Sequence, residues 1–189
     1  MVNYHPWVDR YTQTIACCSQ NMGNWLASFL IEHWLGVINF YLVIILLGSL
    51  FAPYLAHWGY LAVSRLIYGV YHIACHQKDN RCLYVLGHKL GLCARCFSIY
   101  FSLLIFGLIW SLLANVRKKI KPIRFWLAFL LVTPLILDGL TQSLGLREST
   151  TFLRIATGCL FSSAIALWVY PRIKPELTRL NSVAGKSFR

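Results

Sequence analysis

Three cysteines and a histidine stand at spacings that could build a metal centre. Cys75 is followed directly by His76, and a Cys93-x-x-Cys96 pair comes after sixteen intervening residues. A Cys-x-x-Cys pair supplies either two metal ligands or a redox dithiol. Three thiolates and one imidazole form a tetrahedral zinc site, and thiolates also hold iron. We therefore predict a metal ion, zinc in preference to iron, on four ligands: Cys75, His76, Cys93 and Cys96.

The fourth ligand is not fixed by this spacing. Side chains of adjacent residues point about 100° apart on a helix, so Cys75 and His76 can share an ion only where a helix ends. His76 is preferred because we expect the helix to end there. His72 and His88 are the other candidates.

The same cysteines also allow interpretations without a metal. Cys93 and Cys96 could form a reversible disulfide, and Arg95 between them would favour the thiolate. Cys82 lies in the intervening segment and could pair with any of the others. Ordinary buried thiols are the third interpretation, and it is the one we give to Cys159.

Polar side chains of the later segments gather at the same end of the apolar runs. Asp138 and Gln142 fall on one face of a helix, and Arg154 and Thr157 share a stripe on the next helix. A charge at mid-bilayer costs roughly 2.5–3.5 kcal/mol, so such residues usually face a bundle interior and carry function. We predict that Asp138 pairs with Arg154, Arg147 being the other deep cation. The pair could instead only fix helix register. The candidate catalytic residues are Asp138, Gln142 and Arg154.

The composition is that of a membrane protein. Of 189 residues, 58% are hydrophobic and 13% are charged, whereas charged residues make up about a quarter of a soluble domain. The net charge of +12 lies in clusters between long apolar runs. This arrangement indicates attraction to anionic lipid and excludes nucleic acid as a partner. The first apolar run is too long for a cleavable signal peptide.

The sequence predicts an all-α fold, a polytopic transmembrane helix bundle with about five spans. Each run is apolar and long enough to cross a bilayer, although Arg65 and His72 interrupt the second. Residues 1–33 form an N-terminal segment with a candidate interfacial helix at 17–33, residues 34–171 the bundle, and residues 172–189 a basic tail. The five expected spans are Trp34–Ala56, Trp58–His76, Cys93–Val116, Pro122–Leu146 and Thr150–Tyr170.

The orientation follows from the basic residues. The loop at 117–124 holds five Lys and Arg in eight residues, and the tail after Tyr170 holds five more. Cytoplasmic segments carry such an excess, so we expect both in the cytoplasm, in a bacterial-type cell or internal membrane. The opposite, extracytoplasmic face then holds residues 77–92, residues 144–149 and, with five spans, the N-terminus. Four tryptophans fall at the cytoplasmic face, as an aromatic belt would: Trp58, Trp110, Trp126 and Trp168.

Several spaced motifs resemble those of one membrane family, domain of unknown function 2085. They span about residues 60–165, most of the chain. The resemblance implies a membrane protein with a polar site, and it adds Arg81, Arg95 and Thr157 as candidate cofactor-binding residues. It implies no reaction. The motifs are Cys75-His76-Gln77, Arg81, Gly87-His88, Cys93-Ala94-Arg95-Cys96, Pro134 with Asp138-Gly139 and Gln142, and Arg154 with Thr157-Gly158.

Three functions fit these residues. The first is an enzyme that uses the metal ion on a lipid-like or small substrate, with Asp138 as base and Arg154 or Arg147 binding an anionic group. The second is a membrane thiol oxidoreductase that uses Cys93 and Cys96 and passes electrons to a quinone. The third is a non-catalytic subunit, carrier or assembly factor stapled by the metal. The lipid bilayer is a partner in all three, and protein partners are not indicated.

Overall fold

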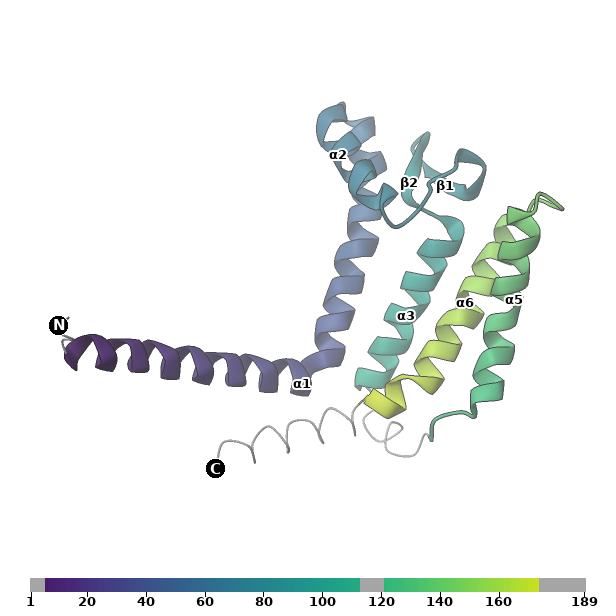
Figure 1. Cartoon of the computed structure of the whole chain (residues 1–189). Coiled ribbons are helices and arrows are strands. Elements are labelled where there is room, and N and C mark those ends of the chain that lie inside the picture. The colour runs from purple at the N-terminus through teal and green to yellow at the C-terminus, as the bar shows by residue number, and fades with distance from the viewer. Residues whose placement is uncertain (1–5, 113–120, 174–189) are drawn as a thin grey trace.

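The structure is a computed structural model that describes the backbone of residues 6–112 and 121–173, with the side chains of Phe29, 33–112 and 121–173. The described part is a helix bundle with one small hairpin at its end (Figure 1). This arrangement confirms the all-α transmembrane fold. The elements are α1 (Pro6–His57), α2 (Leu61–His72), η1 (Asp79–Arg81), β1 (Cys82–Val85), β2 (His88–Cys93), α3 (Ala94–Leu112), α5 (Phe125–Ser143) and α6 (Thr151–Trp168).

Helix α1 bends at His33, where the backbone leaves the helical region with φ −107° and ψ 16°. Figure 1 shows the part before the bend lying at a steep angle to the part after it. The later part, His33–His57, is long and apolar enough to cross a membrane. The interfacial location that the sequence predicts for residues 17–33 stays a prediction.

Four helices of the described chain have the length and hydropathy of membrane spans: His33–His57, Ala94–Leu112, Phe125–Ser143 and Thr151–Ile173. They correspond to the first, third, fourth and fifth expected spans. The second, expected at Trp58–His76, is shorter than predicted. Helix α2 has 12 residues, about 18 Å at 1.5 Å per residue, against a hydrocarbon core of about 30 Å.

Helix α2 folds back along the second half of α1. The turn between them is made at Gly59, whose φ of 84° suits glycine. The Ser64 hydroxyl then donates to the Ala52 carbonyl at 2.8 Å, and the Tyr71 hydroxyl donates to the Ile45 carbonyl at 2.7 Å. The two helices are therefore antiparallel, and the end of α2 returns to the depth of mid-α1.

This fold-back changes the expected topology. The later part of α1 begins at His33, at the end of the bundle where α3 finishes and α5 begins (Figure 1). The N-terminal segment was expected at the opposite face, and the structure places it at the same end as the start of the tail. Trp58 likewise lies at the other end from Trp110, Trp126 and Trp168. The basic loop up to residue 120 and the tail from 174 lie outside the described residues.

The segment 82–93, expected as a loop, forms an antiparallel hairpin that pairs Cys82 with Cys93. Leu86 and Gly87 both have positive φ, 52° and 78°, as a two-residue hairpin turn requires. The backbone of Gly91 lies directly against α1, where an added Cβ would meet the Ser49 Cα at 3.1 Å. This close contact ties the hairpin to the bundle.

Helices α3 and α6 approach closely through small residues. An added Cβ on Gly158 would meet the Arg95 carbonyl oxygen at 3.0 Å and would overlap the Ser98 hydroxyl. The Ser162 hydroxyl donates to the Ile99 carbonyl at 2.9 Å. Small residues of this kind let helix backbones approach in membranes. The contact brings the first turns of α3 and α6, with their arginines, to the same end of the bundle.

Candidate metal centre and cationic pocket

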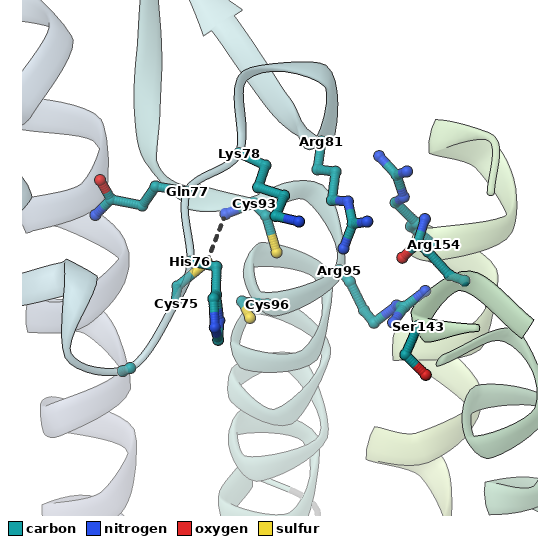
Figure 2. A pocket seen from close by; sticks show the side chains of 12 residues that line it. Cys75, His76, Gln77, Lys78, Arg81, Cys93, Arg95, Cys96, Ser143 and Arg154 are labelled. Atoms are coloured by element: carbon teal, nitrogen blue, oxygen red, sulfur yellow. Dashed lines mark hydrogen bonds between the residues drawn. The ribbon is translucent and has the colours of Figure 1, made fainter. Parts of the chain in front are cut away.

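The structure brings the three predicted cysteines together at the end of the bundle where the hairpin lies. The Sγ atoms of Cys75, Cys93 and Cys96 all lie within 4.8 Å of one another, and all three thiols are free. Cys75 follows α2, Cys93 ends β2, and Cys96 is in the first turn of α3 (Figure 2). The backbone N–H of Cys93 donates to the Cys75 sulfur at 3.3 Å. Three separate elements therefore converge on one point.

Gln77 holds the segment that carries Cys75 in place. Its amide donates to the Tyr68 carbonyl of α2 and to the Gly91 carbonyl of β2, each at 2.9 Å. Its own carbonyl accepts from Lys89 at 3.2 Å. Gln77 is 6% exposed, and its φ of 46° is rare for a residue with a side chain. Such a backbone conformation persists only where the surroundings fix it, and here two hydrogen bonds from one amide do so.

The histidines are less closely involved than expected. His76 lines the same pocket as the cysteines, and Figure 2 shows it beside Cys75 and Cys96. Its ring nitrogens are not among the mutually close ligand atoms, and the residue is exposed. Neither His72 nor His88 is among the described residues that line the pocket. Among the described residues, the cluster thus offers three sulfurs and leaves a fourth ligand position open.

The cysteines outside the transmembrane helices differ in acidity. Hydrogen bonds from the thiols of Cys93 and Cys96 lower the pKa of Cys75 below its usual value. Cys82 lies opposite Cys93 in the hairpin, and burial raises the pKa of Cys82 to about 11. The pKa values of Cys75 and Cys82 are therefore shifted in opposite directions.

A polar cavity of about 440 Å³ opens beside the cysteines. The loop after α2, the starts of α3 and α6 and the end of α5 contribute its walls. The sequence singled out Arg81, Arg95, Gln142 and Arg154, and all four line it. Lys78 also lines it and was missed, because a lone lysine in a polar loop gives no signal. Thr157, a predicted binding residue, instead donates to the Leu153 carbonyl of its own helix at 2.8 Å.

Asp138 is paired with Arg147, the second candidate of the sequence prediction, and not with the preferred Arg154. It is 4% exposed and is paired with Arg95 of α3, with Arg147 at 3.1 Å, and with the Ser149 hydroxyl at 3.0 Å. The expected ion pair with Arg154 is not formed. The physical reason is that the turn after α5 carries Arg147 and Ser149 back over the carboxylate, while Arg95 reaches it from α3. Asp138 therefore holds Arg95 in position beside the cavity.

Arg154 is bound to the backbone instead. Its Nη1 donates to the Asn80 carbonyl of η1 at 3.0 Å. The residue is 2% exposed, and no carboxylate among the described residues forms an ion pair with it. A buried charge without a carboxylate partner is rare in membrane helices, and residues of this kind usually carry function.

Comparisons with known proteins agree with the expectation of a membrane protein. Residues 75–168 match the family described as predicted membrane protein (DUF2085), a range that begins at Cys75 and ends with α6. An uncharacterized protein of Methanocaldococcus jannaschii is 35% identical over 144 residues, covering 70% of this chain and 92% of its own length. Another, from Methanothermobacter thermautotrophicus, is 35% identical over 103 residues, covering 54% of this chain and 88% of its own.

No solved structure matches the chain. The two relatives are archaeal, whereas the sequence analysis expected a bacterial-type membrane. The length and identity of the first match extend well beyond the cysteine motifs, to 92% of that relative. The chain therefore belongs to the DUF2085 family of predicted membrane proteins.

Proposed function

We propose that this protein is a membrane enzyme that holds a zinc ion on Cys75, Cys93 and Cys96 and acts on a small or lipid-like substrate in the adjoining cavity. The observation that carries the proposal is the mutual approach of three sulfur atoms within 4.8 Å. Sulfurs of a tetrahedral zinc site with bonds of about 2.3 Å are about 3.5–4 Å apart, so a small contraction would complete the site. Iron is the alternative ion for the same thiolates.

The open fourth position favours a catalytic over a structural site. Structural zinc sites use four protein ligands, whereas catalytic sites use three and keep one position for water or substrate. His76 is close enough to the cavity to act on a ligand there. When bound, zinc in such a site lowers the pKa of a coordinated water to about 7, which serves hydrolysis.

The other polar residues of the cavity would bind and orient the substrate. Arg154 and Gln142 line the cavity, and Asp138 orients Arg95 at its edge. In this proposal Asp138 positions a cation and is not the base, which revises the role that the sequence analysis gave it. The site lies at the bundle end opposite the basic loop, so we propose that it is extracytoplasmic.

The test is the metal content of the full chain purified in detergent, measured for single Cys→Ser variants. Cys75→Ser, Cys93→Ser and Cys96→Ser should each lose the ion. Cys159→Ser is the matched control, because Cys159 is on α6 and contacts Ser102 at 3.1 Å, away from the cluster. Retention of the ion by all four variants would refute the assignment of ligands.

A thiol oxidoreductase is the second candidate function. The observation that favours it is the register of the hairpin, which sets Cys82 directly opposite Cys93, one of the three clustered cysteines. Four neighbouring cysteines could pass a disulfide between them. Mass spectrometry after thiol labelling separates the two functions, since a reversible disulfide in ion-free protein supports the redox enzyme.

A further inference from the structure

The cavity beside the cysteines contains hydrogen-bond donors with nothing to bind. Four of the residues that line it each have a buried side-chain nitrogen with no hydrogen-bond partner among the described residues: Nε of Arg81, Nε of Arg95, Nε of Arg154 and Nε2 of Gln142. Buried donors are nearly always hydrogen-bonded, and each exception calls for an explanation. Of the seven such side-chain atoms among the described residues, four belong to residues of this one cavity, and the other three, on Asn39, Ser49 and Trp168, lie elsewhere. The common location of the four indicates a missing acceptor and not four separate packing faults.

The charge of the cavity has the same sign as these donors. Lys78, Arg81, Arg95 and Arg154 all line it, and Figure 2 shows the three arginines directed toward the same region. Asp138 binds Arg95, and it is the one carboxylate of residues 33–112 and 121–173 that forms an ion pair with any of these four cations. Three thiolates around a divalent ion would add one further negative charge. The cavity therefore has an excess of positive charge with or without the ion. One of these positive charges, on Arg154, is buried, with the residue 2% exposed.

We propose that this cavity binds a phosphate-type oxyanion. Guanidinium groups match phosphate oxygens in geometry and form charge-assisted hydrogen bonds with them. A tetrahedral oxyanion offers acceptors in several directions, which three arginines, a lysine and an amide can share. The N-terminus of α3 begins at Ala94, between two of the cysteines, and adds its positive dipole. The volume of about 440 Å³ lies within the usual range for small-ligand sites.

As a statement about substrate class, this inference rests on the proposed function, since the oxyanion lies beside the ion site. As a binding site it uses only donors of the arginines, Lys78 and Gln142. The phosphate can belong to a free ion or to a lipid headgroup, because the cavity lies at the end of a membrane bundle. Both sources present the same oxygens to the same donors.

The test measures binding of radiolabelled inorganic phosphate to the detergent-purified full chain at fixed ionic strength. We expect saturable binding that Arg154→Gln weakens by about tenfold or more, the effect of losing one charge-assisted hydrogen bond. Arg124→Gln is the matched control, because Arg124 is an exposed arginine at the start of α5, at the other end of the bundle. If Arg154→Gln does not fold, Arg81→Gln, which is only partly buried, replaces it.

A second arm identifies the source of the phosphate. Nanodiscs with phosphatidic acid that displace labelled phosphate, while nanodiscs of phosphatidylcholine alone do not, identify a lipid headgroup. Failure of phosphatidic acid to displace the label identifies a free ion. The inference would be overturned if neither inorganic phosphate nor phosphatidic acid bound saturably. It would also be overturned if Arg154→Gln and the unaltered chain bound phosphate with equal affinity.

The metal content of the same preparations separates this inference from the proposed function. Ion-free protein that binds phosphate through Arg154 supports the oxyanion site and contradicts only the metal enzyme. Protein that holds its ion and binds neither probe contradicts only the oxyanion site. Arg154→Gln should leave the metal content unchanged, because Arg154 is not among the clustered ligands.

Discussion

Asp138 is the buried carboxylate that compensates positive charge at the hairpin end of the bundle. Its side chain is 2% exposed and compensates Arg95, whose side chain is 19% exposed, and Arg147, whose side chain is 53% exposed. Asp138→Leu leaves Arg95 buried without a counter-ion and the Ser149 hydroxyl without its acceptor. Breaking a buried pair on one side costs about 3–5 kcal/mol. Arg147→Ala should cost about 1 kcal/mol or less, because that partner is half exposed.

Thermal unfolding of the full chain in one detergent measures both changes. We expect a large loss of stability for Asp138→Leu, a small one for Arg147→Ala, and partial recovery when Arg95→Leu is added to Asp138→Leu. The recovery follows because the double change removes both buried charges. Equal destabilisation by the two single variants, or no recovery in the double variant, would refute the reasoning about which partner is buried.

Three further predictions concern packing, the loop and topology. Gly158→Ala should destabilise the chain by about 1–3 kcal/mol through overpacking. Gly69→Ala should instead stabilise it by about 0.5–1 kcal/mol, because nothing lies within 4 Å of the added Cβ. Thermal unfolding of both variants measures these changes, and equal effects would contradict the close contact between α3 and α6. Gln77→Ala should weaken zinc affinity by about tenfold or more in a competitive titration, as loss of an outer-shell partner does, and an unchanged affinity would show that the loop needs no such support. Cysteine labelling should place Lys119 and Lys186 on one side of the membrane, and labelling from opposite sides would contradict the arrangement of the last two spans.

The approach of Cys75, Cys93 and Cys96 could be predicted from the sequence because all three stand at the ends of expected spans that flank one short loop. Cys93 and Cys96 are separated by two residues, and Cys75 was expected at the end of the preceding helix, at the same face of the bundle. The four long spans could be predicted for the same kind of reason, since their hydropathy exceeds what a soluble helix carries. In both cases the information lies within a short stretch of chain.

The fold-back of α2 and the partners of Asp138 could not be predicted in this way. The hydrophobicity of residues 58–76 is that of a weak span, and its length as a helix depends on Gly59 and on hydrogen bonds to α1. Arg95 was assigned to the cysteines because it stands between two of them, yet its side chain reaches α5. Both features are set by tertiary contacts that no local pattern encodes.

The most direct test of the central claim is elemental analysis of the full chain combined with thiol counting. The account predicts about one zinc or iron ion per chain, with the thiols of Cys75, Cys93 and Cys96 protected from alkylation until a chelator is added. Cys82→Ser should keep the ion, because Cys82 is outside the cluster. Ion-free protein in which Cys93 and Cys96 form a reversible disulfide would contradict the metal site.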